Sequence, residues 1–230
     1  MRLLGVLGGM SWTSTAEYYR LLNAGVSERL GGLHSARLLL HSVDFEPIAE
    51  LQHAGDWDGA AEILGSAARG LAAAGAEGVI LATNTMHKVA EPVERAAGVR
   101  LLHIADATAV AVKAAGLSRV GLLGTAFTME DGFLVERLAS HGVTCVVPEA
   151  EDRAEVHRII YDELVLDVVT NPSREAYRGV MERLVEAGAE GMVLGCTEIG
   201  LLVGAGDTTV PVFDTTELHV AAAVDWMLAE

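Results

Sequence analysis

The sequence predicts an α/β protein of two pseudo-symmetric domains, each an open parallel sheet with helices on both faces. Two observations carry this prediction. Short apolar runs alternate with helix-length amphipathic stretches, which is typical of parallel strands joined by helices. The chain also contains an internal repeat, in which three segments of the first half recur in the same order in the second half.

Eight short apolar runs are predicted to be buried strands. Their lengths are usual for strands, and helix-length segments separate most of them. In chain order the predicted strands are Arg2–Leu7, Arg37–Val43, Gly78–Ala82, Leu101–Ile104, Arg119–Gly124, Val143–Val147, Gly191–Gly195 and Val210–Phe213.

Two helix starts are marked by residues that favour them. Ser14 followed by Glu17 has the spacing of a capping box and predicts a helix that runs towards Leu30. Asn171 before Pro172 predicts another start, with asparagine at the cap and proline at the first helical position.

The repeat is clearest where residues 75–85 are compared with residues 188–198, at an offset of 113. Five of the eleven positions are identical, and both segments open with a glycine, Gly75 or Gly188, that is predicted to end a helix just before a strand. Two further matches keep the order and nearly the same offset: residues 5–8 with 121–124, and residues 103–106 with 211–214. The two halves are therefore predicted to be structurally equivalent.

The 230 residues are enough for one large domain or two small ones with packed cores. From the repeat we expect a first domain of residues 1–97 plus 210–230 and a second domain of residues 98–209. Equivalent strand ends face each other if a pseudo-twofold axis relates the halves, so we expect the active site at the interdomain cleft.

Composition excludes several classes of partner and site. The net charge of −16 repels phosphate backbones and anionic lipids, so neither nucleic acid nor a membrane is an expected partner. Two cysteines cannot form a disulfide framework, and neither they nor the eight histidines have metal-ligand spacing. We therefore expect a cytoplasmic protein without a metal site. Only Lys88 and Lys113 could hold pyridoxal phosphate as a Schiff base.

Thr83 and Cys196 occupy the same position of the repeat. Each ends a predicted strand, where open parallel sheets bind ligands, and each precedes a predicted helix, whose first N–H groups bind anions such as carboxylates. Inversion of a carbon centre by proton transfer needs an acid/base group on each face. We expect Thr83 and Cys196 to be such a pair, with Cys196 the better base because a helix N-terminus lowers the pKa of a thiol.

Other interpretations of these residues stay open. Cys145 lies inside a predicted strand and is interpreted as a packing residue. Thr83 to Thr85 could be a plain helix cap. The Thr83 hydroxyl needs a local activator, and His87, one helical turn later, could tune it.

Seven short motifs spread over nearly the whole chain resemble those of the aspartate/glutamate racemase superfamily. They are residues 7–11 (LGGMS), 42–45 (SVDF), 83–88 (TNTMHK), 121–125 (GLLGT), 127–129 (FTM), 195–198 (GCTE) and 213–215 (FDT). The resemblance is closest to the amino-acid racemase branch in which a threonine, here Thr83, replaces the first of two usual cysteines.

This resemblance implies two α/β domains around an interdomain site, a homodimer, no cofactor, and an isomerase that interconverts L- and D-aspartate or glutamate by two-base proton transfer. Thr83 and Cys196 are the implied acid/base pair. The implied substrate-lining residues are Met10, Ser11, Gln52, Asn84, Thr85, Thr125, Thr128, Thr197 and Glu198.

Two other functions are kept as alternatives. An arylmalonate-type decarboxylase of the same superfamily needs only one protonating cysteine, which Cys196 could supply. A two-lobed amino-acid-binding protein without catalysis is the second alternative, although a binding pocket has no need of a thiol at this point.

Overall fold

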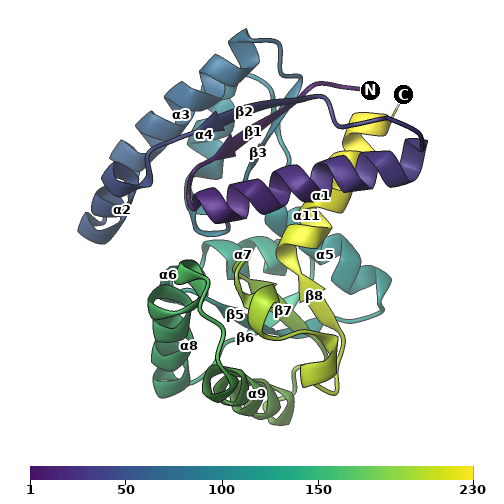
Figure 1. Ribbon diagram of the computed structural model, residues 1–230. Coiled ribbons are helices and arrows are strands. Elements are labelled where there is room, and N and C mark those ends of the chain that lie inside the picture. Colours follow the sequence, from purple (N-terminus) through teal and green to yellow (C-terminus); the bar gives the residue numbers. More distant parts are fainter. Residues whose placement is uncertain (230) are drawn as a thin grey trace. The chain divides into compact units, whose positions relative to one another are not determined.

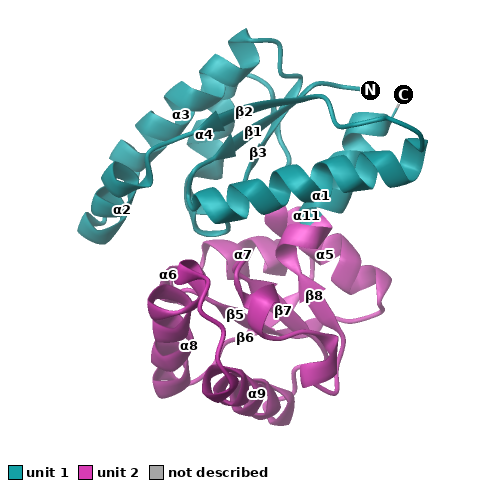
Figure 2. Cartoon of the chain, in the orientation of Figure 1, with its two compact units in different colours: residues 1–103, 219–230 teal, residues 104–218 magenta. Residues whose placement is uncertain are grey.

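The computed structural model describes residues 1–229, which form two compact units (Figures 1 and 2). One unit is Met1–His103 together with the segment from His219 onward, and the other is Ile104–Leu218. Each contains one four-stranded parallel sheet, with the orders β2-β1-β3-β4 and β6-β5-β7-β8. The two orders are the same when counted from the first strand of each sheet, so the predicted equivalence of the halves is confirmed.

The first sheet is central to the first unit. Its strands are β1 (Leu4–Gly8), β2 (Leu38–Ser42), β3 (Gly78–Leu81) and β4 (Arg100–Leu101). The helical elements of this part of the chain are α1 (Trp12–Leu30), α2 (Phe45–Ala54), α3 (Trp57–Ala73), the short 3₁₀ helix η1 (Thr85–Val89), α4 (Ala90–Ala97) and α11 (Thr215–Leu228).

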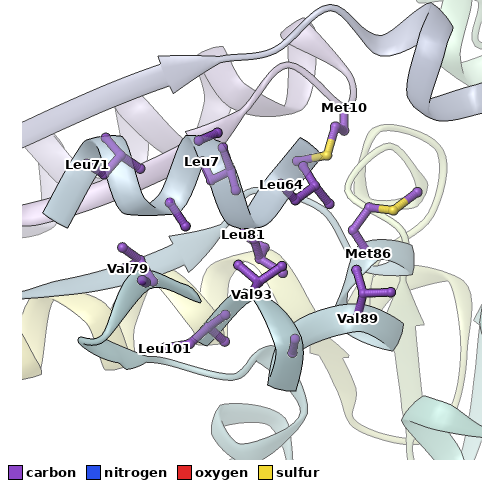
Figure 3. Close-up of a cluster of buried hydrophobic side chains, with 14 of the residues drawn as sticks. Leu7, Met10, Leu64, Leu71, Val79, Leu81, Met86, Val89, Val93 and Leu101 are labelled. Carbon is purple, nitrogen blue, oxygen red and sulfur yellow. The ribbon is translucent and has the colours of Figure 1, made fainter. Parts of the chain in front are cut away.

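Both faces of this sheet are covered, because successive side chains of a strand point to opposite faces. Leu7 and Leu81 belong to a core formed with α2, α3 and α4 (Figure 3). Val6 and Ile80, one residue earlier on the same strands, belong to a core formed with α1 and α11. The continuous apolar runs of the sequence are therefore explained by strands buried on two sides.

The second unit repeats this arrangement. Its strands are β5 (Arg119–Gly124), β6 (Thr144–Val146), β7 (Met192–Gly195) and β8 (Val212–Asp214). Its helical elements are α5 (Ile104–Ala114), α6 (Ala126–Glu130), α7 (Phe133–Ser140), α8 (Ala150–Asp162), η2 (Leu164–Leu166), α9 (Asn171–Glu186), α10 (Ile199–Leu202) and η3 (Ala205–Asp207). Leu194 packs with α8, α9 and α10, whereas Leu122 and Val193 pack with α5 and α7.

The predicted domain boundaries, at 97/98 and 209/210, differ from those observed. β4 pairs with β3 and so belongs to the first unit, and β8 pairs with β7 and so belongs to the second. The chain passes from one unit to the other after each of these edge strands, at His103/Ile104 and within α11 at Leu218/His219 (Figure 2). β4 is thus followed by α5, which packs in the core of the second unit, and β8 is followed by α11, which packs in the core of the first. The pattern of strands in the sequence does not reveal that the chain changes units after these two strands.

All eight predicted strands are present, with ends that differ by up to three residues. The largest difference is at Leu101–Ile104, where the strand ends at Leu101 and Ile104 already begins α5.

Both predicted helix starts were displaced. Ser11, not Ser14, caps α1, because the Ser11 hydroxyl accepts a hydrogen bond from the Ser14 N–H at 3.2 Å. Thr170, not Asn171, caps α9, and its hydroxyl accepts from the Ser173 N–H at 3.2 Å.

The glycines that were predicted to end helices behave as expected. Gly75 and Gly188 follow the last residues of α3 and α9 with φ of 102° and 93°, a conformation that favours glycine. None of the helices within residues 1–229 has both the length and the hydropathy to cross a membrane.

Candidate active site

The end of β3 presents the first group of candidate residues. Thr83 and Asn84 are buried just beyond the strand, and Thr85, which is partly exposed, begins η1. The predicted position of Thr83, between the carboxyl end of a strand and a helical segment, is therefore confirmed. A hydroxyl, an amide and a second hydroxyl follow each other at this strand end, and they can bind a polar ligand.

His87 lies against this strand end. Its Nδ1 atom is 2.9 Å from the backbone oxygen of Thr83. A carbonyl oxygen only accepts hydrogen bonds, so Nδ1 carries the proton and donates it. Burial, followed by the nearby rings of His103 and His219, holds the pKa of His87 well below its usual value. His87 is therefore a neutral imidazole at neutral pH.

The end of β7 presents the second group. Cys196 follows the strand directly, and its thiol donates a hydrogen bond to Glu198 Oε2 at 3.0 Å. The Thr197 hydroxyl donates to the same oxygen at 2.7 Å. Glu198 is buried, so its carboxylate is placed to hold, orient and exchange protons with these two neighbours.

The thiol of Cys196 is not activated in the way the sequence predicts. Burial, then the Glu198 carboxylate and Asp214, raise the pKa of the thiol well above its usual value. The helix that follows, α10, has only four residues and does not outweigh these effects. Cys196 is therefore a protonated thiol in this structure, and it needs a proton acceptor before it can act as a base. Glu198 is the acceptor in contact with it.

Thr125 and Thr128 support the same strand end. Thr125 caps α6, with its hydroxyl accepting from the Thr128 N–H at 3.3 Å, and the two hydroxyls lie 3.2 Å apart. A Cβ atom at Gly195 would lie 3.2 Å from the Thr128 methyl group and 2.9 Å from the Leu123 oxygen. Thr128 thus packs directly beneath the residue that precedes Cys196, so the structure brings this part of the implied set together.

Three other implied residues have roles in the fold of the first unit. Met10 is buried in the core with Leu64 and Met86 (Figure 3). Ser11 caps α1, and Gln52 is a buried polar residue on α2. Whether they also contact a substrate stays a prediction.

Three histidines that the sequence does not predict to be neighbours form a cluster beside Thr83. The ring centroid of His87 lies 4.6 Å from that of His103 and 5.5 Å from that of His219. His219 is fixed in turn by Tyr18, whose hydroxyl is 2.9 Å from Nδ1, and by the Leu102 oxygen, 2.7 Å from Nε2. These residues come from distant parts of the sequence, so their proximity is not predictable from spacing. The one sequence feature that pointed to any of them is that His103 begins a repeated segment, residues 103–106.

Thr216 is a residue that the sequence does not single out. It is buried at the start of α11, and its hydroxyl has no hydrogen-bond partner within residues 1–229. In the same described range, no group of three or more histidine, cysteine and acidic side chains is arranged to hold a metal ion.

Comparison with known proteins gives three close similarities. A candidate Asp/Glu racemase from Yersinia pestis, known as a crystal structure, is 53% identical over 100% of both chains, with a TM-score of 0.95. An aspartate racemase homologue from Pyrococcus horikoshii OT3 is 33% identical over 100% of both chains, with a TM-score of 0.86. An uncharacterized protein of Pectobacterium carotovorum subsp. carotovorum is 32% identical over 128 residues, 55% of this chain and 84% of that protein.

The fold and the two strand ends are those of an α/β protein with a thiol at the carboxyl edge of one sheet. The Asp/Glu/Hydantoin racemase family matches residues 7–223, and the chain belongs to this family. Membership of this family supports the assignment of the protein as a racemase, which is a type of isomerase.

Proposed function

We propose that the protein is a cofactor-independent racemase that interconverts the L and D forms of aspartate or glutamate. One observation carries the proposal: the equivalent ends of β3 and β7 place a hydroxyl, Thr83, and a thiol, Cys196, at the same position of the repeat. Two-base racemisation needs such a pair on opposite faces of one carbon atom. The descriptions of the relatives support the choice of acidic amino acids as substrates.

Cys196 starts the reaction as a protonated thiol. Its proton passes to the Glu198 carboxylate, 3.0 Å away, which leaves a thiolate and a neutral carboxylic acid. The thiolate then takes the α-proton of the amino acid, so the S–H bond is restored and a carbanion remains on the α-carbon. The free energy of this carbanion must be lowered by hydrogen-bond donors in a site from which water is excluded.

Thr83 completes the inversion. Its hydroxyl gives a proton to the opposite face of the carbanion and is reprotonated through solvent, to which Glu198 returns the proton it had accepted. No proton is gained or lost over the cycle. A hydroxyl is a far weaker acid than a thiol, so the step at Thr83 is expected to limit the rate.

The test is proton NMR in deuterated water with L-aspartate and, separately, L-glutamate, together with chiral analysis of the products. Wild-type protein is expected to lose the α-hydrogen signal and to form the D enantiomer. Cys196→Ala should abolish both, whereas the matched control Cys145→Ala, at the other cysteine, should retain both. Undiminished exchange in Cys196→Ala would overturn the assignment, and absence of exchange in the wild type with either substrate would overturn the proposed function.

A one-thiol decarboxylase is the second candidate, and the single thiol at the two strand ends favours it. Such an enzyme protonates one face of a carbanion that is left when carbon dioxide departs from a disubstituted malonate. Release of carbon dioxide from α-methyl-α-phenylmalonate, without exchange of amino-acid α-hydrogens, would select this candidate. Tight binding of an amino acid with neither activity would instead select the binding protein.

A further inference from the structure

His87 stands where the two halves of the protein differ. At the repeat offset of 113, Thr83 corresponds to Cys196 and His87 corresponds to Gly200. The second half therefore has no side chain at this position, and a Cβ atom at Gly200 would lie only 2.7 Å from Asp214 Oδ2. The half of the chain that contains Thr83 thus has a buried histidine, His87, at this position. The half that contains Cys196 has Gly200, with the Asp214 carboxylate close to it.

The ring of His87 is fixed on several sides. Its Nδ1–H donates to the Thr83 oxygen at 2.9 Å, and the edges of two other rings, those of His103 and His219, lie against it at 4.6 and 5.5 Å between centroids. His219 is itself held between the Tyr18 hydroxyl and the Leu102 oxygen. Tyr18 lies on α1 and His219 on α11, so helices from both ends of the chain hold this ring system in place.

The hydrogen bond from His87 acts on the one peptide group that carries the Thr83 side chain. Thr83 lies beyond the last hydrogen-bonded residue of β3, so the sheet does not fix its carbonyl. A group that must deliver a proton to a carbanion has to be held within a fraction of an ångström of its working position. The hydrogen bond from Nδ1 supplies this constraint at the strand end.

We infer that His87 is a positioning residue for the hydroxyl half of the reaction: its Nδ1–H holds the Thr83 carbonyl and thereby sets the place of the Thr83 hydroxyl. This inference rests on the proposed racemase function. Burial and the adjacent histidines keep His87 neutral, so it serves as a fixed hydrogen-bond donor rather than as a charge.

Two substitutions separate the two ring nitrogens. The amide nitrogen of asparagine can take the place of Nδ1, so His87→Asn keeps a donor for the Thr83 oxygen. Glutamine places its amide farther out, near the position of Nε2, so His87→Gln loses this donor at similar polarity. Asn23→Ala is the control for lost stability, since it removes a hydrogen bond to the Ala36 N–H elsewhere in the same unit.

The readout is a ratio that does not depend on how much protein is folded. Each enantiomer of the substrate is incubated in deuterated water, and deuterium is measured in the recovered enantiomer and in its mirror image. When Cys196 removes the proton, exchanges it for a deuteron of the solvent and returns that deuteron to the same face, the configuration is retained. Inversion requires Thr83. A defect confined to the Thr83 side therefore lowers inversion relative to retention, whereas partial unfolding lowers both equally.

We expect His87→Gln to lower the ratio of inversion to retention by roughly tenfold or more with the enantiomer whose proton Cys196 removes. His87→Asn should restore most of the ratio, and Asn23→Ala should leave it unchanged. A second measurement is independent of catalysis: ¹⁵N NMR of the histidine side chains should show His87 as the Nδ1–H tautomer at pH 7.

A wild-type ratio in His87→Gln, or an Nε2–H tautomer at His87, would overturn this inference while leaving the racemase intact. A wild-type protein that exchanges no α-hydrogen would overturn the proposed function, and the inference with it.

Discussion

Glu198 is one of the two main influences on the protonation of Cys196, the other being burial. It accepts hydrogen bonds from the Cys196 thiol and the Thr197 hydroxyl, and its charge lies beside the sulfur. After burial, this carboxylate is the largest cause of the raised pKa of the thiol. The same residue thus helps to keep the thiol protonated at rest and is the acceptor in contact with its proton.

Replacement of Glu198 by glutamine should lower the pKa of the Cys196 thiol, because the amide removes the negative charge that opposes thiolate formation. The pH profile of alkylation by iodoacetamide measures this, since only the thiolate reacts. The comparison is made with and without Glu198→Gln in a Cys145→Ala background. The pKa of Cys145 is raised to about 12 by burial, so that thiol is unreactive at neutral pH in any case. A midpoint that stays in place or rises would show that Glu198 does not control the thiol.

His87 should make the free energy of unfolding depend on pH. Its pKa is lowered in the folded protein by burial and by the rings of His103 and His219. Below a pH of about 6.5, His87 is therefore protonated in the unfolded chain but stays neutral in the folded protein. The stability from the neutral ring is present above that pH and is lost as the pH falls, by up to about 1.4 kcal/mol per pH unit. In urea titrations between pH 7 and 5, His87→Asn should lose stability less steeply than wild type or Asn23→Ala. Parallel profiles would contradict a neutral, buried His87.

At the scale of elements, the sequence predicts what periodicity and the repeat encode. Buried runs such as residues 119–124 predict strands well because both faces of each sheet are covered. The caps of α1 and α9 were misplaced, because several hydroxyl residues stand at each helix start and only geometry selects Ser11 or Thr170. The repeat also placed Thr83 and Cys196 correctly at strand ends. It could not predict the raised pKa of Cys196, which depends on how its neighbours pack around it.

The turn between β1 and α1 depends on a glycine that leaves no room for a side chain. A Cβ atom at Gly8 would lie 2.6 Å from Thr15 Oγ1 and would also meet the Thr15 methyl group. The hydroxyl of Thr15 cannot easily move, because it accepts from the Gly9 N–H at 2.8 Å and donates to the Ser11 oxygen at 2.7 Å.

Gly8→Ala is therefore expected to destabilise the protein by about 1–3 kcal/mol, the usual range for an overpacked core. Gly70→Ala is the matched control. Gly70 is an exposed residue of α3 with open space around its would-be Cβ atom, so alanine should stabilise by about 0.5–1 kcal/mol. Urea unfolding gives both values. Equal effects of the two substitutions would contradict the steric argument.

At the scale of the whole molecule, acidic residues exceed basic ones by a factor of two. The chain has 32 aspartates and glutamates against 16 lysines and arginines. The positive charges can therefore neutralise only half of the negative ones. Ion pairs such as Arg20 with Glu17 or Arg29 with Asp225 are largely exposed and contribute little each. A homodimer and a cytoplasmic location stay predictions.

Repulsion among the excess carboxylates should therefore outweigh the attraction within the surface ion pairs. Monovalent salt should then stabilise the protein. Salt screens both, but the net charge of −16 leaves more repulsion than attraction to be screened. We expect the melting temperature to rise by about a few degrees between roughly 20 and 500 mM sodium chloride. The double variant Glu28→Lys/Glu50→Lys changes two exposed residues, one on α1 and one on α2, and makes the net charge less negative by four. Its melting temperature should depend less on salt than that of the wild type. A melting temperature that falls with salt in the wild type would mean that the ion pairs, and not the excess of acidic residues, dominate the electrostatic free energy of this fold.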